Sequence, residues 1–310
     1  MELREYIVSR GLQTIATFIL SIGIIFFLFR IMPGDPVSIV IRLGATGLSE
    51  EEINTLRSVF GLDRPLHEQF FIYLWNVATF NLGTSFFYRI PVSELLFSRL
   101  INTIVLVGLG TFFSIVIGLA LGVIAGWYKG SKVDTAAVSF SLLFYSMPSF
   151  WIGMVFIYLF SVIFNIFPTG GILSPRIVDE SNTLTRLLDF LHHLSLPLIT
   201  YSLGFAGQYA LVMRNTLVNV LREDYILTAK AKGLTDTQII RNHALKNASL
   251  PSITLIAINI GLIILGTISI ETVFSWPGVG RLVYEAILFR DFPVLQGTFI
   301  FFTLFIFYHF

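Results

Sequence analysis

The sequence contains no cysteine, which excludes disulfide bonds, cysteine-ligated metals and thiol catalysis. Charge is also scarce: 13% of the 310 residues are charged, whereas a soluble globular chain carries about 25%. The formal net charge is only +1, so nothing in it favours nucleic acid as a partner. The five histidines follow no recognisable metal-ligand spacing. We therefore expect no metal, no cofactor and no nucleic acid bound to this chain.

Motifs of catalysis and nucleotide binding are missing as well. The chain has no HExxH, no GxSxG, no GxxxxGK[ST] and no glycine-rich dinucleotide fingerprint. We therefore expect a protein that is not an enzyme. If it moves a solute uphill, the energy must come from another protein.

Hydrophobic residues, by contrast, make up 55% of the chain, and the mean hydropathy is +0.80. A membrane-spanning helix needs roughly 20 apolar residues. The candidate spans are residues 12–31, 102–128, 135–167, 193–213, 250–270 and 295–310. This pattern predicts an all-α polytopic bundle of six spans, with the first span retained as a helix rather than cleaved. The last span stops within an apolar run, so we expect it to be truncated.

The segments between the spans predict three parts. Residues 1–31 form the amino terminus and span one, residues 32–99 a small helical insertion, and residues 100–310 the transmembrane core. In the insertion, Ser49 and Glu52 have capping-box spacing, and a second helix is expected to start at Pro65. The insertion is either a docking cap or a packed loop that covers the bundle.

Basic residues predict the orientation. Segments 1–11, 127–134 and 214–249 total 55 residues and carry ten Lys or Arg, including every lysine. The opposite segments, 30–99, 168–190 and 273–293, carry ten arginines over 114 residues. The positive-inside rule therefore predicts a multi-pass protein of the cell membrane with a cytoplasmic amino terminus and an external insertion.

Residues 214–249, which we call the polar loop, are expected to contain two short helices. The first runs over 224–232, with acids at its start and Gly233 as its stop, and the second starts with a capping box of Thr235 and Gln238. Helices this short are not stable alone, so the apolar side of the first must rest on the bundle, on lipid or on a partner. Because that side is narrow and includes Ala229, a groove in a soluble partner is favoured.

The spans contain few ionisable residues. An ion-driven transporter usually keeps Asp, Glu or His deep in the membrane, whereas here Glu271 lies at the outer end of span five. Ser146, Ser149 and Asn259 could line an aqueous path, or they could only bond neighbouring helices. Pro148 should interrupt the helix of span three.

Span two contains Gly118, Gly122 and Gly126 at four-residue spacing. Small residues four apart share one helix face and allow another helix to approach closely. We therefore expect tight helix packing along this face, which is architectural and says little about function.

The polar loop resembles the cytoplasmic "EAA" loop of binding-protein-dependent ABC importer permeases, most closely the dipeptide, oligopeptide and nickel branch. Its stretches "DYILTAKAKGL" and "HALKNASLP" match the forms usual in that branch, although the general Glu-Ala-Ala is here Leu227, Thr228 and Ala229. Further motifs follow in the family's order: "RIMPGDP", "NLGTSFFYRIPV", "YSMPSFWIG", "FPTGG" and "ISIETVFSWPGVGRLVYEAILFRDFPVLQG".

The resemblance implies a permease subunit that forms a solute path with a second, similar permease. It also implies two ATPase subunits, which bind ATP and Mg, and an extracytoplasmic solute-binding protein. The residues expected to set the ATPase coupling are Glu223, Asp224, Tyr225, Ala229, Lys232 and Gly233. Glu271 and Trp276 would shape an outer gate or meet the binding protein, with a tight Pro-Gly turn as the alternative.

Other classes stay open at this point. An ion-coupled secondary transporter or channel would work without ATP, and a purely structural membrane subunit would not need the capped helix pair. An intramembrane enzyme would need a reactive pair that the sequence does not show. The resemblance implies short peptides as solute, with oligosaccharides or a metal chelate as options.

Overall fold

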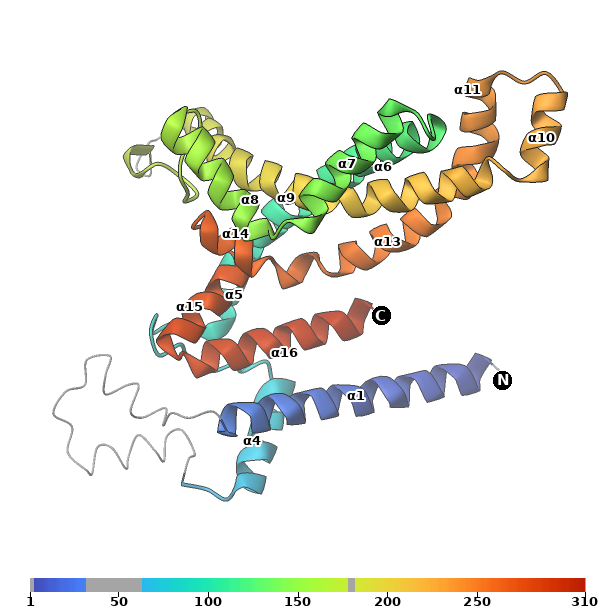
Figure 1. Ribbon diagram of the computed structural model, residues 1–310. Helices are drawn as coiled ribbons and strands as arrows, with labels where there is room; N and C mark the ends of the chain where they lie inside the picture. Colours follow the sequence, from blue (N-terminus) through green and yellow to red (C-terminus); the bar gives the residue numbers. More distant parts are fainter. Residues whose placement is uncertain (1–2, 32–62, 178–181, 310) are drawn as a thin grey trace. The chain divides into compact units, whose positions relative to one another are not determined.

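The computed structural model describes residues 3–31, 63–177 and 182–309, and these residues form helices joined by turns (Figure 1). The extended pairing within them is one isolated bridge between Thr84 and Pro91. The predicted all-α class is confirmed. The helix expected after Ser49 lies outside the described residues, whereas the one expected at Pro65 is α4 (Leu66–Ala78).

Three helices among the described residues are long and apolar enough to cross a membrane alone. They are α1 (Leu3–Ile31), the continuous helix Val92–Trp127 and α9 (Thr183–Val220). The second comprises α5 (Val92–Thr103), a π-helical turn and α6 (Leu109–Trp127). Two bent helix pairs qualify when each pair is taken as one span, and α16 (Phe292–His309) is a shorter apolar helix. These elements overlap the six predicted spans, although their bounds differ and only five of them qualify as spans by the length and composition of their described residues.

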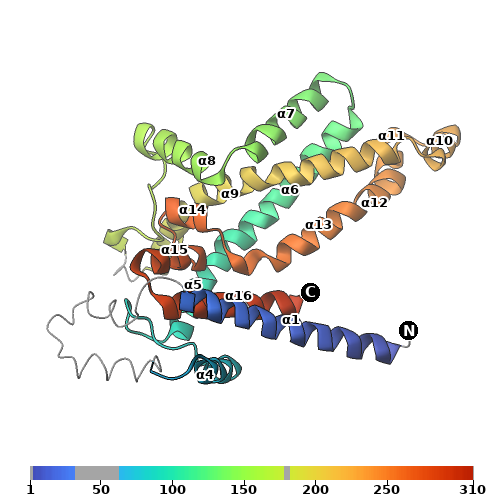
Figure 2. The ribbon, with the colours of Figure 1, turned by 60° about the horizontal axis from the view of Figure 1, so that its bottom comes forward.

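The chain divides into two compact units, residues 1–101 with 282–310 and residues 102–281. In the first unit, α1 and α16 lie side by side, as both views show (Figures 1 and 2). Aromatic contacts join them, including Phe18 with Phe307 at 5.9 Å and Phe29 with Phe292 at 6.2 Å between ring centroids. Aromatic edge contacts of this kind stabilise helix pairs without any polar group.

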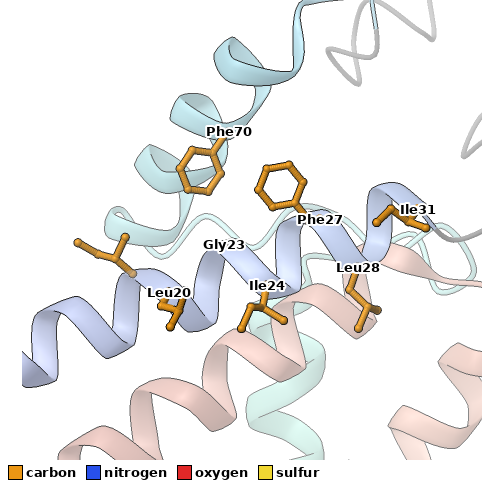
Figure 3. A pocket seen from close by; sticks show the side chains of 8 residues that line it. Leu20, Gly23, Ile24, Phe27, Leu28, Ile31 and Phe70 are labelled. Carbon is orange, nitrogen blue, oxygen red and sulfur yellow. The ribbon is translucent and has the colours of Figure 1, made fainter.

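A groove runs along α1 where Phe70 of α4 approaches it (Figure 3). Its lining is aliphatic and aromatic apart from one glycine: Ile19, Leu20, Gly23, Ile24, Phe27, Leu28, Ile31 and Phe70. These side chains offer no partner to a charged or hydrogen-bonding solute. The groove therefore suits hydrocarbon and not the passage of a polar molecule.

In the second unit, α6 packs closely on α9 through its glycines. A Cβ at position 122 would lie 2.6 Å from the carbonyl oxygen of Ala210, and one at position 118 would overlap the carbonyl of Ala206. At Gly126 the approach is looser, because an added Cβ would lie 3.1 Å from the Leu217 side chain. The predicted close approach is confirmed, because only hydrogen fits between these backbones.

Span three is two helices rather than one. The pair α7 (Lys132–Ser146) and α8 (Ser149–Phe156) meets at an angle of 99°, and a π-helical segment extends α8 to Ile163. Pro148 caps α8 and has no N–H to continue the helix from α7. The predicted interruption is confirmed, and its angle is far larger than that of a kinked single span.

Span five ends earlier than predicted. α13 (Leu250–Gly261) is followed by a short 3₁₀ turn, Ile263–Leu265. Gly266 then adopts φ +69°, a left-handed conformation that stops the helix. The chain restarts as α14 (Ile268–Val273), so the predicted continuous span 250–270 is wrong at its carboxyl end.

Candidate functional site

The first helix of the polar loop is α10 (Asp224–Ala231), close to the predicted 224–232. Gly233 has φ +78°, and its N–H donates to the carbonyl of Lys230 at 2.9 Å. A left-handed glycine after the last turn is a common helix stop, so the predicted stop is confirmed. Figure 1 shows α10 and the following α11 (Asp236–Ile239) beyond the end of α9.

The second helix starts with the predicted capping box. The backbone N–H of Thr235 donates to Oε1 of Gln238 at 2.9 Å. From α11 the helix continues through a π-helical turn, Ile240–Ala244, and α12 (Leu245–Ala248) to the start of α13. It forms a 51° bend with α13, so the polar loop is joined directly to the fifth span.

The apolar side of α10 rests on this chain itself. Ile226 is fully buried and Ala229 is 4% exposed, in one cluster with Met213 and Leu217 of α9 and with Ile239. This corrects the sequence-based preference for a groove in a soluble partner. A narrow apolar stripe fits the base of its own bundle as well as any foreign groove, and amphipathicity alone does not distinguish the two.

We call this packing of Ile226 and Ala229 on the chain the seat of α10. A hydrogen bond adds to it, because Asn247 Nδ2 donates to the Tyr225 hydroxyl at 2.8 Å. The opposite face of α10 is exposed, and it includes Leu227, whose side chain is 59% exposed. The exposed candidate coupling residues are Glu223, Asp224, Tyr225, Lys232 and Gly233. Thus α10 has one face fixed to the chain and another face available for contact.

A groove of about 750 Å³ lies beside the second helix. Its floor is apolar and comes mainly from α6, and its rim includes Arg241, Asn242 and Lys246 of the polar loop. The polar loop therefore borders α6 as well as α9.

Glu271, in α14, is the centre of a separate buried network. Its Oε1 accepts hydrogen bonds from the Thr103 hydroxyl at 3.0 Å and from the Thr267 N–H at 3.4 Å, and its Oε2 accepts from the Arg281 N–H at 3.0 Å. Thr103 accepts in turn from the Val279 N–H at 2.8 Å, so its only hydroxyl hydrogen goes to Glu271. The carboxylate is satisfied by donors of its own chain.

Trp276 is fully buried beside this network, so its side chain offers no surface to a partner in this structure. Its Nε1 donates to the carbonyl of Asn102 at 2.9 Å, and Asn102 Nδ2 donates to the carbonyl of Pro277 at 2.9 Å. Asn102 and Thr103 together therefore hold the turn after α14. Sequence reasoning considered Asn102 only as a polar residue that could line a path, and it missed Thr103; the only signal was a polar pair at the start of an apolar span.

Glycines make this network possible. A Cβ at position 278 would overlap the Glu271 carboxylate, and one at position 280 would lie 3.0 Å from Glu271 Oε2. A side chain at position 278 must therefore displace the carboxylate, and one at position 280 would also press on the backbone at Thr267 and Ile268. The Pro-Gly turn predicted as the alternative role for this segment is present, and it is also part of the Glu271 network.

The three candidate path residues are not brought together by the described contacts. Asn259 Nδ2 donates to the Tyr209 hydroxyl at 2.8 Å and so joins α13 to α9. Ser146 is exposed and bonds the carbonyl of Leu143 in its own helix, while Ser149 is half-buried at the start of α8. These contacts are those of helix packing.

Sequence reasoning also missed a bidentate ion pair between Arg214 and Asp134. Arg214 Nη2 and Nε bond the two carboxylate oxygens of Asp134 at 2.7 and 3.1 Å, which ties α9 to α7. The signal available in sequence was one acid and one base at the ends of two apolar runs. Among the described residues, no group of three or more His, Cys, Asp or Glu is arranged to hold a metal ion.

Comparison with known proteins identifies the group to which the chain is similar. The family described as "Binding-protein-dependent transport system inner membrane component" matches residues 118–308, and its amino-terminal companion matches residues 3–107. The chain belongs to this family. This permease is therefore a multi-pass membrane protein and the permease subunit of an ABC importer, not the ATPase, as the motifs predicted.

Similar curated proteins cover nearly the whole permease. The dipeptide transport system permease protein DppB of Escherichia coli (strain K12) is 38% identical over 308 residues, covering 94% of this chain and 90% of that one. A probable peptide ABC transporter permease of Sinorhizobium fredii is also 38% identical, with coverage of 94% and 90%. The permease chain of the inward-facing methionine ABC transporter MetNI aligns with a TM-score of 0.49 at 19% identity over 69% of this chain and 93% of that chain.

Proposed function

We propose that this permease carries short peptides, which a solute-binding protein delivers and ATPase subunits drive across the membrane. The names of the two 38% identical relatives support a peptide as the solute. In this proposal the permease pairs with a second, similar permease, and ATP and Mg bind to the ATPase subunits. Oligosaccharides and metal chelates remain the competing solutes.

The single observation that carries the coupling mechanism is the seating of α10. Ile226 and Ala229 fix one face of the helix to α9, while Leu227 and Asp224 stay on the exposed face. A helix held in this way moves with the spans beneath it when a partner pulls on its free face. We assign the exposed face to ATPase docking and Ala229 to the seat.

The proposed orientation places the polar loop and the amino terminus in the cytoplasm. Lysine and arginine are about twice as dense in the segments on that side as in the opposite segments, which favours this side as cytoplasmic. The Glu271 network then lies at the external end of α13, and its buried turn would help to shape the outer gate. Both assignments follow from the charge count and the chain order.

Leu227 provides the sharpest test of docking, because it is exposed and its replacement need not disturb the seat. Leu227→Glu should abolish peptide uptake and the ATPase stimulation caused by the loaded binding protein, because a buried unpaired charge opposes docking. Leu227→Met is the matched control and should retain both activities. Undiminished uptake by the Glu variant would show that this face does not couple the ATPase.

The solute needs an experiment of its own. Uptake of a labelled dipeptide by reconstituted complex should fall when unlabelled dipeptides or tripeptides compete, and should not fall with an oligosaccharide or a nickel chelate. Competition by one of the latter two alone would replace peptide as the assigned solute.

A further inference from the structure

A cluster of exposed aromatic, aliphatic and basic side chains lies in the first unit, next to the start of α16. It consists of Phe87, Arg89, Ile287, Leu288, Phe289 and Arg290, and we call it the Phe-Arg patch. Two segments supply it: the loop 85–90 before α5, and the end of α15 (Val279–Phe289) with the turn that leads into α16.

The patch is built rigidly. The rings of Phe87 and Phe289 stack at 3.9 Å with an interplanar angle of 4°. Beneath them Asp291 is 1% exposed, and its carboxylate accepts from the Ser85 hydroxyl at 2.5 Å and from the Phe87 N–H at 3.1 Å. A further bond joins Tyr88 to Glu285 of α15 at 2.6 Å. These hydrogen bonds fix the two segments to each other and so hold the stacked rings in place.

The other side chains of the patch are exposed. Ile287 and Leu288 are 56% and 59% exposed, and the two stacked rings are each 39% exposed. Arg89 and Arg290 are both exposed, and both have positive φ, 57° and 54°. The patch thus combines an apolar surface with two positive charges at its edge.

From this arrangement we infer that the Phe-Arg patch binds the membrane interface, with its rings and aliphatic side chains at the acyl boundary and its two arginines on lipid phosphates. The position of the patch along the chain favours lipid as its partner. Phe289 and Arg290 lie just before α16, an apolar helix that begins at Phe292. Side chains at this point of the chain lie near the depth of the headgroups. Surfaces that lie in this layer typically combine Phe and Leu side chains with Lys or Arg.

A transient protein partner explains the patch less well. A binding protein covers its docking surface for only part of each transport cycle, so Ile287 and Leu288 would otherwise stand in water. Lipid covers them throughout, and burial of apolar surface is favourable at all times rather than at intervals. Lipid is therefore the favoured partner, and adding the binding protein to the experiment below distinguishes the two. The inference does not depend on which solute the permease carries.

This chain contains no cysteine, so a single introduced cysteine is the only one in it and can be labelled in the purified permease before the complex is assembled. Leu288→Cys and Arg290→Cys variants of the full complex in bilayers would carry a nitroxide label. Collision with oxygen and with a water-soluble nickel complex then reports the depth of each label. Leu304→Cys on α16 is the hydrocarbon reference, and Lys129→Cys in the turn after α6 is the water reference.

We expect the label at 288 to collide more with oxygen than with the nickel complex. The label at 290 should give a depth between those of the two references. Labels as hydrated as the one at 129 that become protected only when binding protein is added would assign the patch to that protein and overturn the inference. Labels inaccessible to both reagents would mean a permanent protein cover and would also overturn it.

The arginines have a separate readout. In the Phe289→Cys background, replacing neutral lipid with phosphatidylglycerol should shift the label toward the bilayer. The double replacement Arg89→Gln and Arg290→Gln should abolish that shift, because the charges that attract phosphate are gone. Arg222→Gln, in the polar loop, is the matched control and should leave the shift unchanged. A shift that persists without the two arginines would remove them from the assigned contact.

Discussion

The polar loop and the Glu271 network lie at opposite ends of α13, and they use polar side chains in opposite ways. In the polar loop, charged side chains such as Asp224 and Lys232 are exposed, while the apolar residues Ile226 and Ala229 hold the helix to the bundle. In the Glu271 network, the single carboxylate is fully buried and meets hydroxyl and backbone donors. These charged side chains of the loop are free to contact a partner, whereas the Glu271 carboxylate is already hydrogen-bonded within the fold. A mutation should therefore damage coupling at one end and stability at the other.

The largest effect is expected from Glu271→Ala. It removes the acceptor that Thr103, Thr267 and Arg281 share, and a buried donor that is left unpaired, such as the Thr103 hydroxyl, costs about 1–3 kcal/mol. The thermal unfolding temperature of the purified complex in detergent should fall steeply. Thr103→Ser keeps the hydroxyl and should leave most of the stability in place. An unchanged unfolding temperature for Glu271→Ala would show that the network does not stabilise this end.

A smaller loss of stability is expected from Gly278→Ala. The added methyl group would overlap the Glu271 carboxylate and force it away from its donors without removing it. Gly108→Ala is the matched control in span two, since a Cβ there has no atom within 4 Å. The same unfolding measurement should show a decrease for position 278 and no decrease for position 108. Equal behaviour of the two variants would contradict the tight packing described for the network.

The smallest effect on stability, but a clear effect on coupling, is expected from Gly233→Val. A branched residue at φ +78° costs about 1–2 kcal/mol, and no neighbour crowds the position, so the strain stays local to the end of α10. Binding-protein-stimulated ATPase activity should be lost while the complex still assembles. Gly233→Asn tolerates this conformation better and should retain most of the activity. Full stimulation in the Val variant would separate the stop of α10 from coupling.

Local sequence patterns predicted local structure well in this chain. The capping box of Thr235 and Gln238, the stop at Gly233 and the interruption at Pro148 all depend on residues within a few positions of one another. The same holds for the glycine spacing of span two, because four residues return to the same helix face. Motifs in the family's order likewise sufficed to place the chain among the permeases.

Long-range contacts could not be predicted in this way. Thr103 and Glu271 are 168 positions apart, and no periodicity connects them. Asp134 and Arg214 are 80 apart, and the chain offers many other possible pairs of acid and base. The polar loop is a further example. Its amphipathic pattern predicted an apolar face on the first helix but not which part of the chain or which partner covers that face.

The sequence by itself thus determined the class of protein, the approximate spans and the capped helices, because these follow from hydropathy and from hydrogen bonds between near neighbours. Only the tertiary structure decided that Ala229 faces its own bundle, that Glu271 accepts a hydrogen bond from Thr103 of span two, and that Phe87 stacks on Phe289. The contacts of Glu271 with Thr103 and of Phe87 with Phe289 join segments that are remote along the chain, and the cluster around Ala229 joins separate helices. Their partners are selected by how the whole chain packs, and a pattern of near neighbours carries no record of that choice.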